Sequence, residues 1–167
     1  TDNADFITNN DIEGNEEISF EFTNANDEQL TFTGVLNGLR NKATKNQRTL
    51  YTFDFTSYEV RKNEGQFITK RFKEDPKTII EQMITKLGGK INKVEGEGKP
   101  MNFLGTRKRP TDIIKNVLTH GVTTDTKASY TEKGKSQKEK NSGTTGFLCW
   151  QTLDGYRFNS IDKILKG

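Results

Sequence analysis

The sequence has little cysteine, histidine or proline. Its 167 residues include one cysteine, Cys149, one histidine, His120, and three prolines. A single cysteine excludes an internal disulfide framework and any zinc site built from several cysteines. A single histidine excludes multi-histidine metal sites and weakens the case for a histidine-based catalytic triad. Much enzyme chemistry is therefore excluded before any motif is considered.

Apolar side chains are also scarce. They make up 30 % of the sequence, below the ~45–50 % of an average globular protein, a figure that also counts glycine. The core must therefore be small, and the 11 phenylalanines must supply much of it. No apolar run approaches the ~18 residues that a membrane helix needs, so we expect no membrane span. The first 30 residues are polar and acidic and show no signal-peptide pattern. Because the chain begins with Thr1, a processed product and a piece of a longer protein are both open.

Charge is unevenly distributed along the chain. Residues 1–60 carry 11 acidic and 4 basic side chains, a net charge of −7, whereas residues 61–167 carry 22 basic and 12 acidic ones, a net charge of +10. The first 28 residues contain no lysine or arginine. Such a split is typical of a nucleic-acid-binding surface, of faces that meet oppositely charged neighbours in an assembly, or of ordinary solvated surface. All three interpretations stay open at this point.

Apolar and polar residues alternate in the first part of the chain, which predicts β-strands. After an irregular opening segment, residues 1–15, three runs share apolar side chains at every second position: Ile18, Phe20 and Phe22, then Leu30, Phe32 and Gly34, then Tyr51, Phe53 and Phe55. A turn at residues 24–27 and a polar loop at residues 41–48 are expected between them. Residues 66–72 form a shorter strand candidate. This spacing predicts an antiparallel sheet or partial barrel.

The pattern changes to helical spacing after residue 75. Asp75 is a suitable N-cap and Pro76 a suitable first helical residue. Apolar residues then recur every three or four positions until Gly88, a C′ glycine, so the sequence predicts a helix there. A second helix is expected from Pro110 to a glycine at position 121. Its N-cap is poor because Arg109 offers no acceptor, and the connection between the two helices, rich in glycine, is expected to be irregular.

The last part of the chain combines a polar stretch with an aromatic hairpin. Residues 123–145 hold one aromatic side chain, Tyr130, and otherwise small or polar residues, which predicts a mobile loop. An apolar strand at residues 147–150 and a second strand after it are separated by Asp154-Gly155, the preferred dipeptide of a type I′ turn. A two-residue loop at this dipeptide places Leu153 opposite Tyr156 and Gln151 opposite Phe158. Ser160 is expected to cap a short final helix.

Possible catalytic residues are few. His120 lies near the C-terminus of a predicted helix, where a cation meets the negative end of the helix dipole, and this structural role is favoured over that of a general base. Cys149 lies in an apolar strand, which favours a buried inert thiol over a nucleophile. Glu16, Glu17 and Glu21 could suggest a metal or acid–base pair, but solvation on the polar strand face explains Glu17 and Glu21. The stretch at residues 96–98 lacks the sequence and context of a phosphate loop.

Basic residues near the second helix are a candidate for phosphate contact. Arg107-Lys108-Arg109 precedes this helix, and Lys70-Arg71 and Lys73 add to the charge. An OB-like module is therefore the alternative hypothesis, in which the strand Tyr51-Thr52-Phe53-Asp54-Phe55 would form a stacking platform beside the basic triplet. Stacking aromatics must be exposed, whereas structural ones should be buried. We expect these basic residues to be ordinary surface charge, and we do not expect nucleic acid as a partner.

Three stretches carry a resemblance to a known family. They are EGNEEISFEFTNAND from Glu13, the segment from Leu50 through TSYEVRKNEGQFITKRF to EDPKTIIEQMI, and GFLCWQTLDGYRFNSID from Gly146. In their order and spacing they resemble the central baseplate hub proteins of T-even-type contractile-tailed bacteriophages. The resemblance covers most of the chain except residues 123–145.

The resemblance implies a structural role in the virion, at the tail baseplate assembled in the host cytoplasm. Hub proteins form homotrimers at the tip of the tail tube, and each subunit holds two barrel-like domains. Their partners are the tail tube proteins, the tail spike or lysozyme protein and the baseplate wedge proteins. Hub proteins have further strands before such a region and a second barrel after it, and the sequence contains neither, so the match covers a fragment or a module.

The combined expectation is an α+β fold, a partial antiparallel β-barrel followed by an α-helical plus β-hairpin domain. Residues 1–73 would belong to the barrel-like domain, and residues 74–167 to the helix and hairpin domain. The function expected from the resemblance is the central hub that links the tail tube to the membrane-piercing spike. We expect no enzyme activity, no catalytic residue, no cofactor and no metal site.

Overall fold

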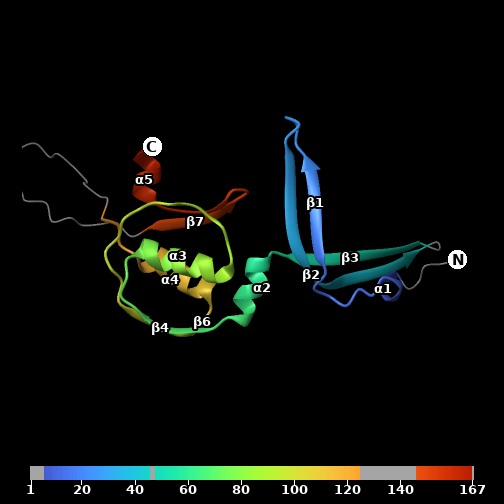
Figure 1. Cartoon of the computed structure of the whole chain (residues 1–167), viewed down its shortest axis with the longest axis horizontal. Helices are drawn as coiled ribbons and strands as arrows, with labels where there is room; N and C mark the ends of the chain where they lie inside the picture. The colour runs from blue at the N-terminus through green and yellow to red at the C-terminus, as the bar shows by residue number, and fades with distance from the viewer. Residues whose placement is uncertain (1–5, 46–47, 125–145, 167) are drawn as a thin grey trace, which may run out of the picture. The chain divides into compact units, whose positions relative to one another are not determined.

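The computed structural model describes residues 6–45, 48–124 and 146–166. The chain divides into two compact units, residues 1–61 and residues 62–167 (Figure 1). The fold is α+β, with a curled antiparallel half-barrel sheet in the first unit and helices with a β-hairpin in the second, as the sequence predicted. The division lies before the predicted boundary at residues 73 and 74, because the strand at residues 68–72 pairs within the second unit.

The first unit contains a short helix and one sheet. Its elements are α1 (Phe6–Asn9), β1 (Glu17–Thr23), β2 (Gln29–Lys45) and β3 (Arg48–Thr56). The sheet has the order β1-β2-β3 and is antiparallel throughout. Side-chain amide and backbone groups close the turn between β1 and β2, where Asn24 Oδ1 accepts the N–H groups of Asn26 and Glu28, both at 2.9 Å. The three alternating strands and this turn are therefore confirmed.

The long strand β2 bends between two partners. Its first part, up to Val35, pairs with β1, and its later part, from Val35 onward, pairs with β3. Register shifts at residues 36–38 and 39–41 interrupt the second pairing, and such bulges increase local twist. Figure 1 shows β1 and β3 running in different directions from the bend of β2. The predicted loop at residues 41–48 was wrong, since β2 extends to Lys45 and β3 begins at Arg48. Cross-strand pairing outweighed the polar composition there.

The second unit packs two helices between two sheets. Its elements are α2 (Tyr58–Gly65, beginning in the first unit), β4 (Ile68–Phe72), α3 (Pro76–Leu87), β5 (Ile91–Val94), β6 (Phe103–Lys108), α4 (Pro110–His120), β7 (Phe147–Thr152), β8 (Gly155–Ser160) and α5 (Ile161–Lys166). One sheet is β4-β6 and the other is β5-β8-β7. Helices α3 and α4 pack against each other, and in Figure 1 they lie between β4 and β6 on one side and β7 on the other.

The hydrophobic core belongs to this second unit. It is made of apolar side chains from both helices and both sheets: Phe72, Ile79, Ile80, Met83, Ile84, Ile113, Val117, Phe147 and Phe158. Two stacked ring pairs join it, Phe72 with Phe103 at 4.9 Å between centroids and Phe147 with Phe158 at 5.0 Å. Helical spacing in the sequence located most of this core correctly.

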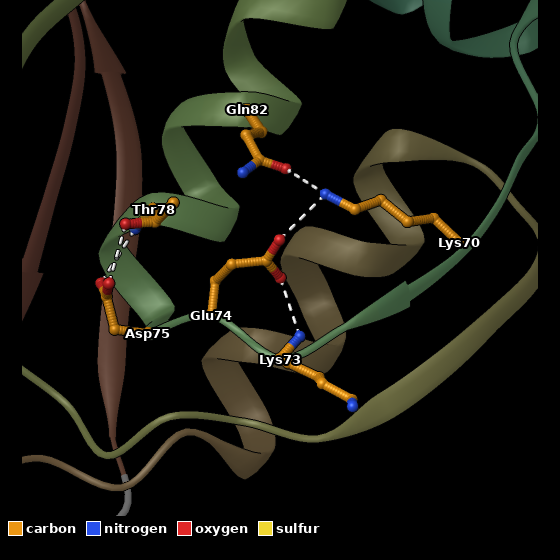
Figure 2. Close-up of polar contacts among 6 residues, drawn as sticks. All are labelled: Lys70, Lys73, Glu74, Asp75, Thr78 and Gln82. Carbon is orange, nitrogen blue, oxygen red and sulfur yellow. Dashed lines mark hydrogen bonds and ion pairs between the residues drawn. The ribbon is translucent and has the colours of Figure 1, made fainter.

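The caps of α3 are those that the sequence predicted. Asp75 Oδ1 accepts the backbone N–H of Thr78 at 3.0 Å, and Asp75 Oδ2 accepts the Thr78 hydroxyl at 2.8 Å (Figure 2). Pro76 is the first helical residue. Gly88 ends the helix in the left-handed conformation, φ 77°, which glycine adopts without strain.

Several short elements of the second unit were not predicted. Helix α2 lies in a polar stretch with weak helical periodicity, and β5 and β6 lie in the connection that was expected to be irregular. β5 pairs with β8 in parallel, a pairing that was not predicted. β5 and β8 are far apart in the sequence, and no short turn connects them. Local sequence patterns therefore predicted neither their pairing nor its parallel direction.

The hairpin of β7 and β8 has a different register from the predicted one. Gln151 lies opposite Tyr156 and Thr152 opposite Gly155, so the loop is Leu153-Asp154. Gly155, with φ 129°, belongs to the strand. A Cβ at this position would collide with the backbone carbonyl of Lys90 on the approach to β5. This glycine serves a close approach between strands instead of a type I′ turn.

The predicted loop at residues 123–145 lies mostly outside the described residues. Its first two residues are ordered parts of the second unit: Thr123 is fully buried and forms a β-bridge with Gly98, and the N–H of Thr124 donates to Glu97 O at 3.0 Å. Ser160 precedes α5 as expected, and its Oγ accepts the Lys163 N–H at 3.3 Å. Within the described ranges, no helix combines the length and the apolar character needed to cross a bilayer.

Candidate functional site

Aromatic rings line one side of the first unit's sheet. We call the set the aromatic surface: Phe20, Phe22, Phe32, Tyr51, Phe53 and Phe55. Phe20 contacts the rings of Phe22, Phe32 and Phe55, and Phe53 contacts those of Tyr51 and Phe55, with centroid distances from 5.5 Å for Phe20 and Phe55 to 6.5 Å for Phe20 and Phe32. Alternation along β1 and β3 brings them to one side of the sheet, because side chains two positions apart on a strand share a face.

This aromatic surface is only partly covered, whereas structural aromatic side chains were expected to be buried. The side chains of Phe20, Phe22 and Phe32 are 36 %, 58 % and 46 % exposed, and those on β3 are half-buried. Among the described residues of the first unit, Val35 and Leu36 are the only buried apolar side chains, and both lie at the bend of β2. The unit therefore presents much of its apolar area instead of enclosing it.

The opposite side of β1 is acidic and polar. Glu17 and Glu21 are exposed, and their cross-strand partners are Val35 and Thr31, which carry no charge. Gln29 Nε2 donates to Glu21 Oε2 at 3.2 Å. The expectation that alternation puts both carboxylates on the polar face is confirmed.

Glu16 has a local structural role. Its carboxylate accepts the backbone N–H groups of Glu13, at 2.7 Å, and Gly14, at 2.9 Å. Hydrogen bonds from its own backbone N–H and from these two groups hold the pKa of Glu16 below its usual range. The carboxylate closes the turn before β1.

His120 and Cys149 are both in the second unit, in unlike surroundings. The exposed His120 ring ends α4, and its Nδ1 lies 3.1 Å from the Asn116 carbonyl and 2.9 Å from the Thr119 hydroxyl. Cys149 is half-buried in β7, opposite Phe158, and burial raises the pKa of its thiol to about 11. A thiol with so high a pKa is a poor nucleophile at neutral pH.

A groove runs between β6 and α4. Its main hollow has a volume of about 450 Å³, and its lining includes Phe103, Lys108, Asp112, Lys115 and His120. A second hollow of about 380 Å³ shares the walls formed by Phe103 and His120. The lining also includes Thr119, whose hydroxyl lies 2.9 Å from His120 Nδ1.

The basic triplet lies at the end of β6, beside an exposed aromatic ring. Arg107 Cζ is 5.7 Å and Arg109 Cζ 5.9 Å from the ring centroid of Phe67, which is 56 % exposed. We call these three residues the Phe67 cluster. Guanidinium groups over a ring face are held by cation–π attraction. Sequence reasoning found the arginines but missed Phe67, whose place beside them depends on the pairing of β4 with β6.

Two other basic residues of the predicted phosphate contact, Lys70 and Arg71, form side-chain hydrogen bonds within the second unit. Lys70 Nζ donates to Glu74 Oε1 and to Gln82 Oε1, both at 3.0 Å, and the Lys73 backbone N–H donates to the second Glu74 oxygen at 2.8 Å (Figure 2). The contact with Lys70, with further help from the Lys73 N–H, keeps the pKa of Glu74 below its usual range. Arg71 Nε donates to Asn102 Oδ1 at 3.2 Å. This network ties β4 to α3.

The glycine-rich stretch at residues 96–98 is a packing feature. Gly96 has φ 102°, and a Cβ there would lie 2.8 Å from the Ser160 backbone nitrogen. Across the described residues, no group of three or more His, Cys, Asp and Glu side chains could hold a metal ion.

Comparison of the sequence with protein-family models and with curated proteins found no match. The surfaces themselves therefore carry the functional inference. They are the aromatic surface and acidic face of the first unit and the Phe67 cluster of the second.

Proposed function

We propose that the protein is a structural component of a phage tail baseplate, the central hub that links the tail tube to the membrane-piercing spike. The observation that carries the proposal is the aromatic surface on a bent, half-barrel sheet. The three-part sequence resemblance supplies the identity of the assembly. The role is structural, without catalysis or a cofactor.

The first unit has the physical character of an assembly module. An isolated two-stranded hairpin is marginally stable in water, and a small sheet needs at least three strands with a hydrophobic face, or packing against a helix, for independent stability. Here β1 and β3 each pair with one side of β2, so both are edge strands. An edge strand with an apolar face invites pairing with another chain unless it is covered. Burial of the partly exposed Phe20, Phe22 and Phe32 in an assembly removes this liability.

The proposed partners follow from the resemblance. They are two further copies of the chain in a homotrimer, the tail tube proteins, the tail spike or lysozyme protein, and the baseplate wedge proteins. The location is the baseplate of the virion. The uneven charge, −7 over residues 1–60 and +10 over residues 61–167, supports contacts between unlike faces in such an assembly.

The alternative is an OB-like nucleic-acid-binding module. Its proposed platform, Tyr51, Phe53 and Phe55 on β3, is half-buried, with ring contacts among its members and to Phe20. Bases would have to stack on these rings within the acidic half of the chain, where phosphates are repelled. The triplet Arg107-Lys108-Arg109 belongs to the other unit. These observations favour assembly over nucleic-acid binding.

The test is the oligomeric state by light scattering, with Ile18→Asp as the disrupting variant. Ile18 lies on the apolar side of β1, so the buried carboxylate should dissociate a wild-type trimer into monomers. Ser19→Asp adds the same charge on the polar side and should leave the trimer intact. Phe22→Ser, a milder change at a 58 % exposed position, should weaken the trimer without unfolding the chain.

A monomeric wild-type protein that binds single-stranded nucleic acid, with affinity falling steeply as salt rises, would refute the hub proposal and favour the alternative. A trimer indifferent to both Ile18→Asp and Phe22→Ser would refute the role of the aromatic surface.

A further inference from the structure

We propose that the Phe67 cluster binds the acidic face of β1 in a second copy of this chain, in a head-to-tail contact. The proposal rests on the proposed function, because the homotrimer supplies the second copy. It names the charged contact between subunits, which is distinct from the aromatic surface.

The Phe67 cluster holds two cations in place. Both guanidinium carbons lie within 6 Å of the same ring centroid, at 5.7 and 5.9 Å. Among the described residues, neither guanidinium has a carboxylate partner. The N–H groups of a guanidinium match a carboxylate in bidentate geometry. The cluster is therefore ordered to receive acidic groups.

The surroundings of the cluster add positive charge. Lys108 lies between the two arginines in sequence, and Arg109 immediately precedes α4, whose N-terminal end carries the positive pole of the helix dipole. The acid nearest in sequence, Asp112, accepts the backbone N–H of Arg109 at 3.3 Å. Like charges at short range repel, so an acidic partner relieves the repulsion that the folded unit leaves in place.

The complementary surface is on the same chain. Glu17 and Glu21 are exposed on one face of β1, opposite uncharged residues of β2. Glu17 accepts a hydrogen bond from the Tyr58 hydroxyl and Glu21 accepts one from Gln29, so among the described residues each meets neutral donors only. No lysine or arginine occurs in the first 28 residues, so this face lacks cations of its own strand and turn. Two carboxylates four residues apart on one strand face present acceptors to the arginine N–H groups.

The contact must join unlike faces of different copies. Two acidic faces, or two Phe67 clusters, would repel each other in an isologous dimer. A contact between face and cluster can occur twice in a two-fold dimer or once per subunit in a closed ring, and the homotrimer of the proposed function selects the ring. A ring of three copies uses every cluster and every acidic face once. Charge complementarity thus favours a second copy over nucleic acid as the occupant.

The experiment is a charge-reversal rescue on the full chain. Arg107→Glu with Arg109→Glu should raise the dissociation constant of the oligomer by at least about tenfold, measured by sedimentation velocity at low salt. Glu17→Lys with Glu21→Lys should do the same. The four substitutions combined should restore association, since every reversed cluster then meets a reversed face. Lys77→Glu with Lys86→Glu, on exposed positions of α3, is the matched control and should change nothing.

The milder pair Arg107→Gln with Arg109→Gln should weaken association less, and circular dichroism confirms that each variant is folded. An oligomer that persists through both reversals overturns this contact and leaves the hub proposal standing. A monomeric wild-type protein overturns both. Loss of association without rescue, together with loss of binding to a single-stranded oligonucleotide in the arginine variant, overturns the contact in favour of nucleic acid.

Discussion

Asp75 is the residue whose local chemistry the structure defines best. Its carboxylate caps α3 through Thr78, and the helix packs against the core of the second unit. Asp75→Ala removes both acceptors and should lower the free energy of unfolding by about 1 kcal/mol. Urea denaturation followed by the fluorescence of Trp150, the single tryptophan, measures the change. Asp54→Ala, outside the second unit, should leave this transition in place.

The same carboxylate should make stability depend on pH. Burial raises the pKa of Asp75, but the hydrogen bonds from the Thr78 N–H and hydroxyl outweigh it, so the folded pKa lies below the ordinary 3.8. The stabilisation is therefore complete well above pH 3.8 and is lost as the pH falls through the folded value. Asp75→Asn keeps a cap without a titrating group. Its urea midpoint should fall less than that of the wild type between pH 6 and pH 2.5, and parallel curves would contradict this account.

Cys149 should react slowly as long as the second unit is folded. With its pKa at about 11, about one thiol in a thousand is ionised at pH 8. Modification by a disulfide reagent should be about a hundredfold slower than in urea, where the thiol has its ordinary pKa. The signal is unambiguous because the chain has one cysteine. Equal rates in buffer and urea would show that the thiol is exposed and activated.

At the scale of elements, α2 supplies the cap that α4 lacks. Arg109 precedes α4 without an acceptor, but Asn63 Oδ1 accepts both the N–H and the hydroxyl of Thr111, each at 3.0 Å. Asn63 is 8 % exposed, whereas Thr111, whose two donors it accepts, is an exposed residue. Asn63→Ala should therefore lower the free energy of unfolding by about 1–2 kcal/mol.

Urea denaturation of the second unit measures this effect as well. Asn63→Asp keeps the acceptor and should retain most of the stability, whereas Glu64→Ala, an exposed neighbour on α2, should have almost no effect. An Asn63→Ala protein as stable as the wild type would mean that the two donors find water.

At the scale of the whole molecule, stability should reside in the second unit. Its core encloses aromatic and aliphatic side chains from four elements or more, whereas the described first unit buries only Val35 and Leu36. Residues 58–167 expressed alone should unfold cooperatively in urea. Residues 1–61 alone should show no cooperative transition, because small sheets without a covered face are marginal. A sharp transition for residues 1–61 would show that the aromatic surface stabilises the unit by itself.

Short-range sequence patterns predicted the elements that have clear alternation or capping residues. Alternation gave β1, β3 and the start of β2, the Asp75-Pro76 pair gave the start of α3, and Ser160 gave the start of α5. The hairpin at β7 and β8 was predicted too, but its register was not, because the close approach of Lys90 to Gly155 decides it. The aromatic surface was predicted as strands, and its exposure was not.

The sequence by itself determined the chemistry available and the periodic elements: few candidate catalytic groups, an uneven charge, and strands and helices with clear caps. The expectation that phenylalanine supplies much of the core was wrong, since three of the nine described core side chains are phenylalanines. Only the tertiary structure decided the partners of those elements. In the tertiary structure β4 pairs with β6, and β5 pairs in parallel with β8. Phe67 lies beside two arginines, and Asn63 provides a hydrogen-bond acceptor at the N-terminal end of α4. The physical reason is the sequence separation between the residues that interact. Capping and alternation act within a few residues, whereas pairing and burial join residues tens of positions apart, which no local pattern encodes.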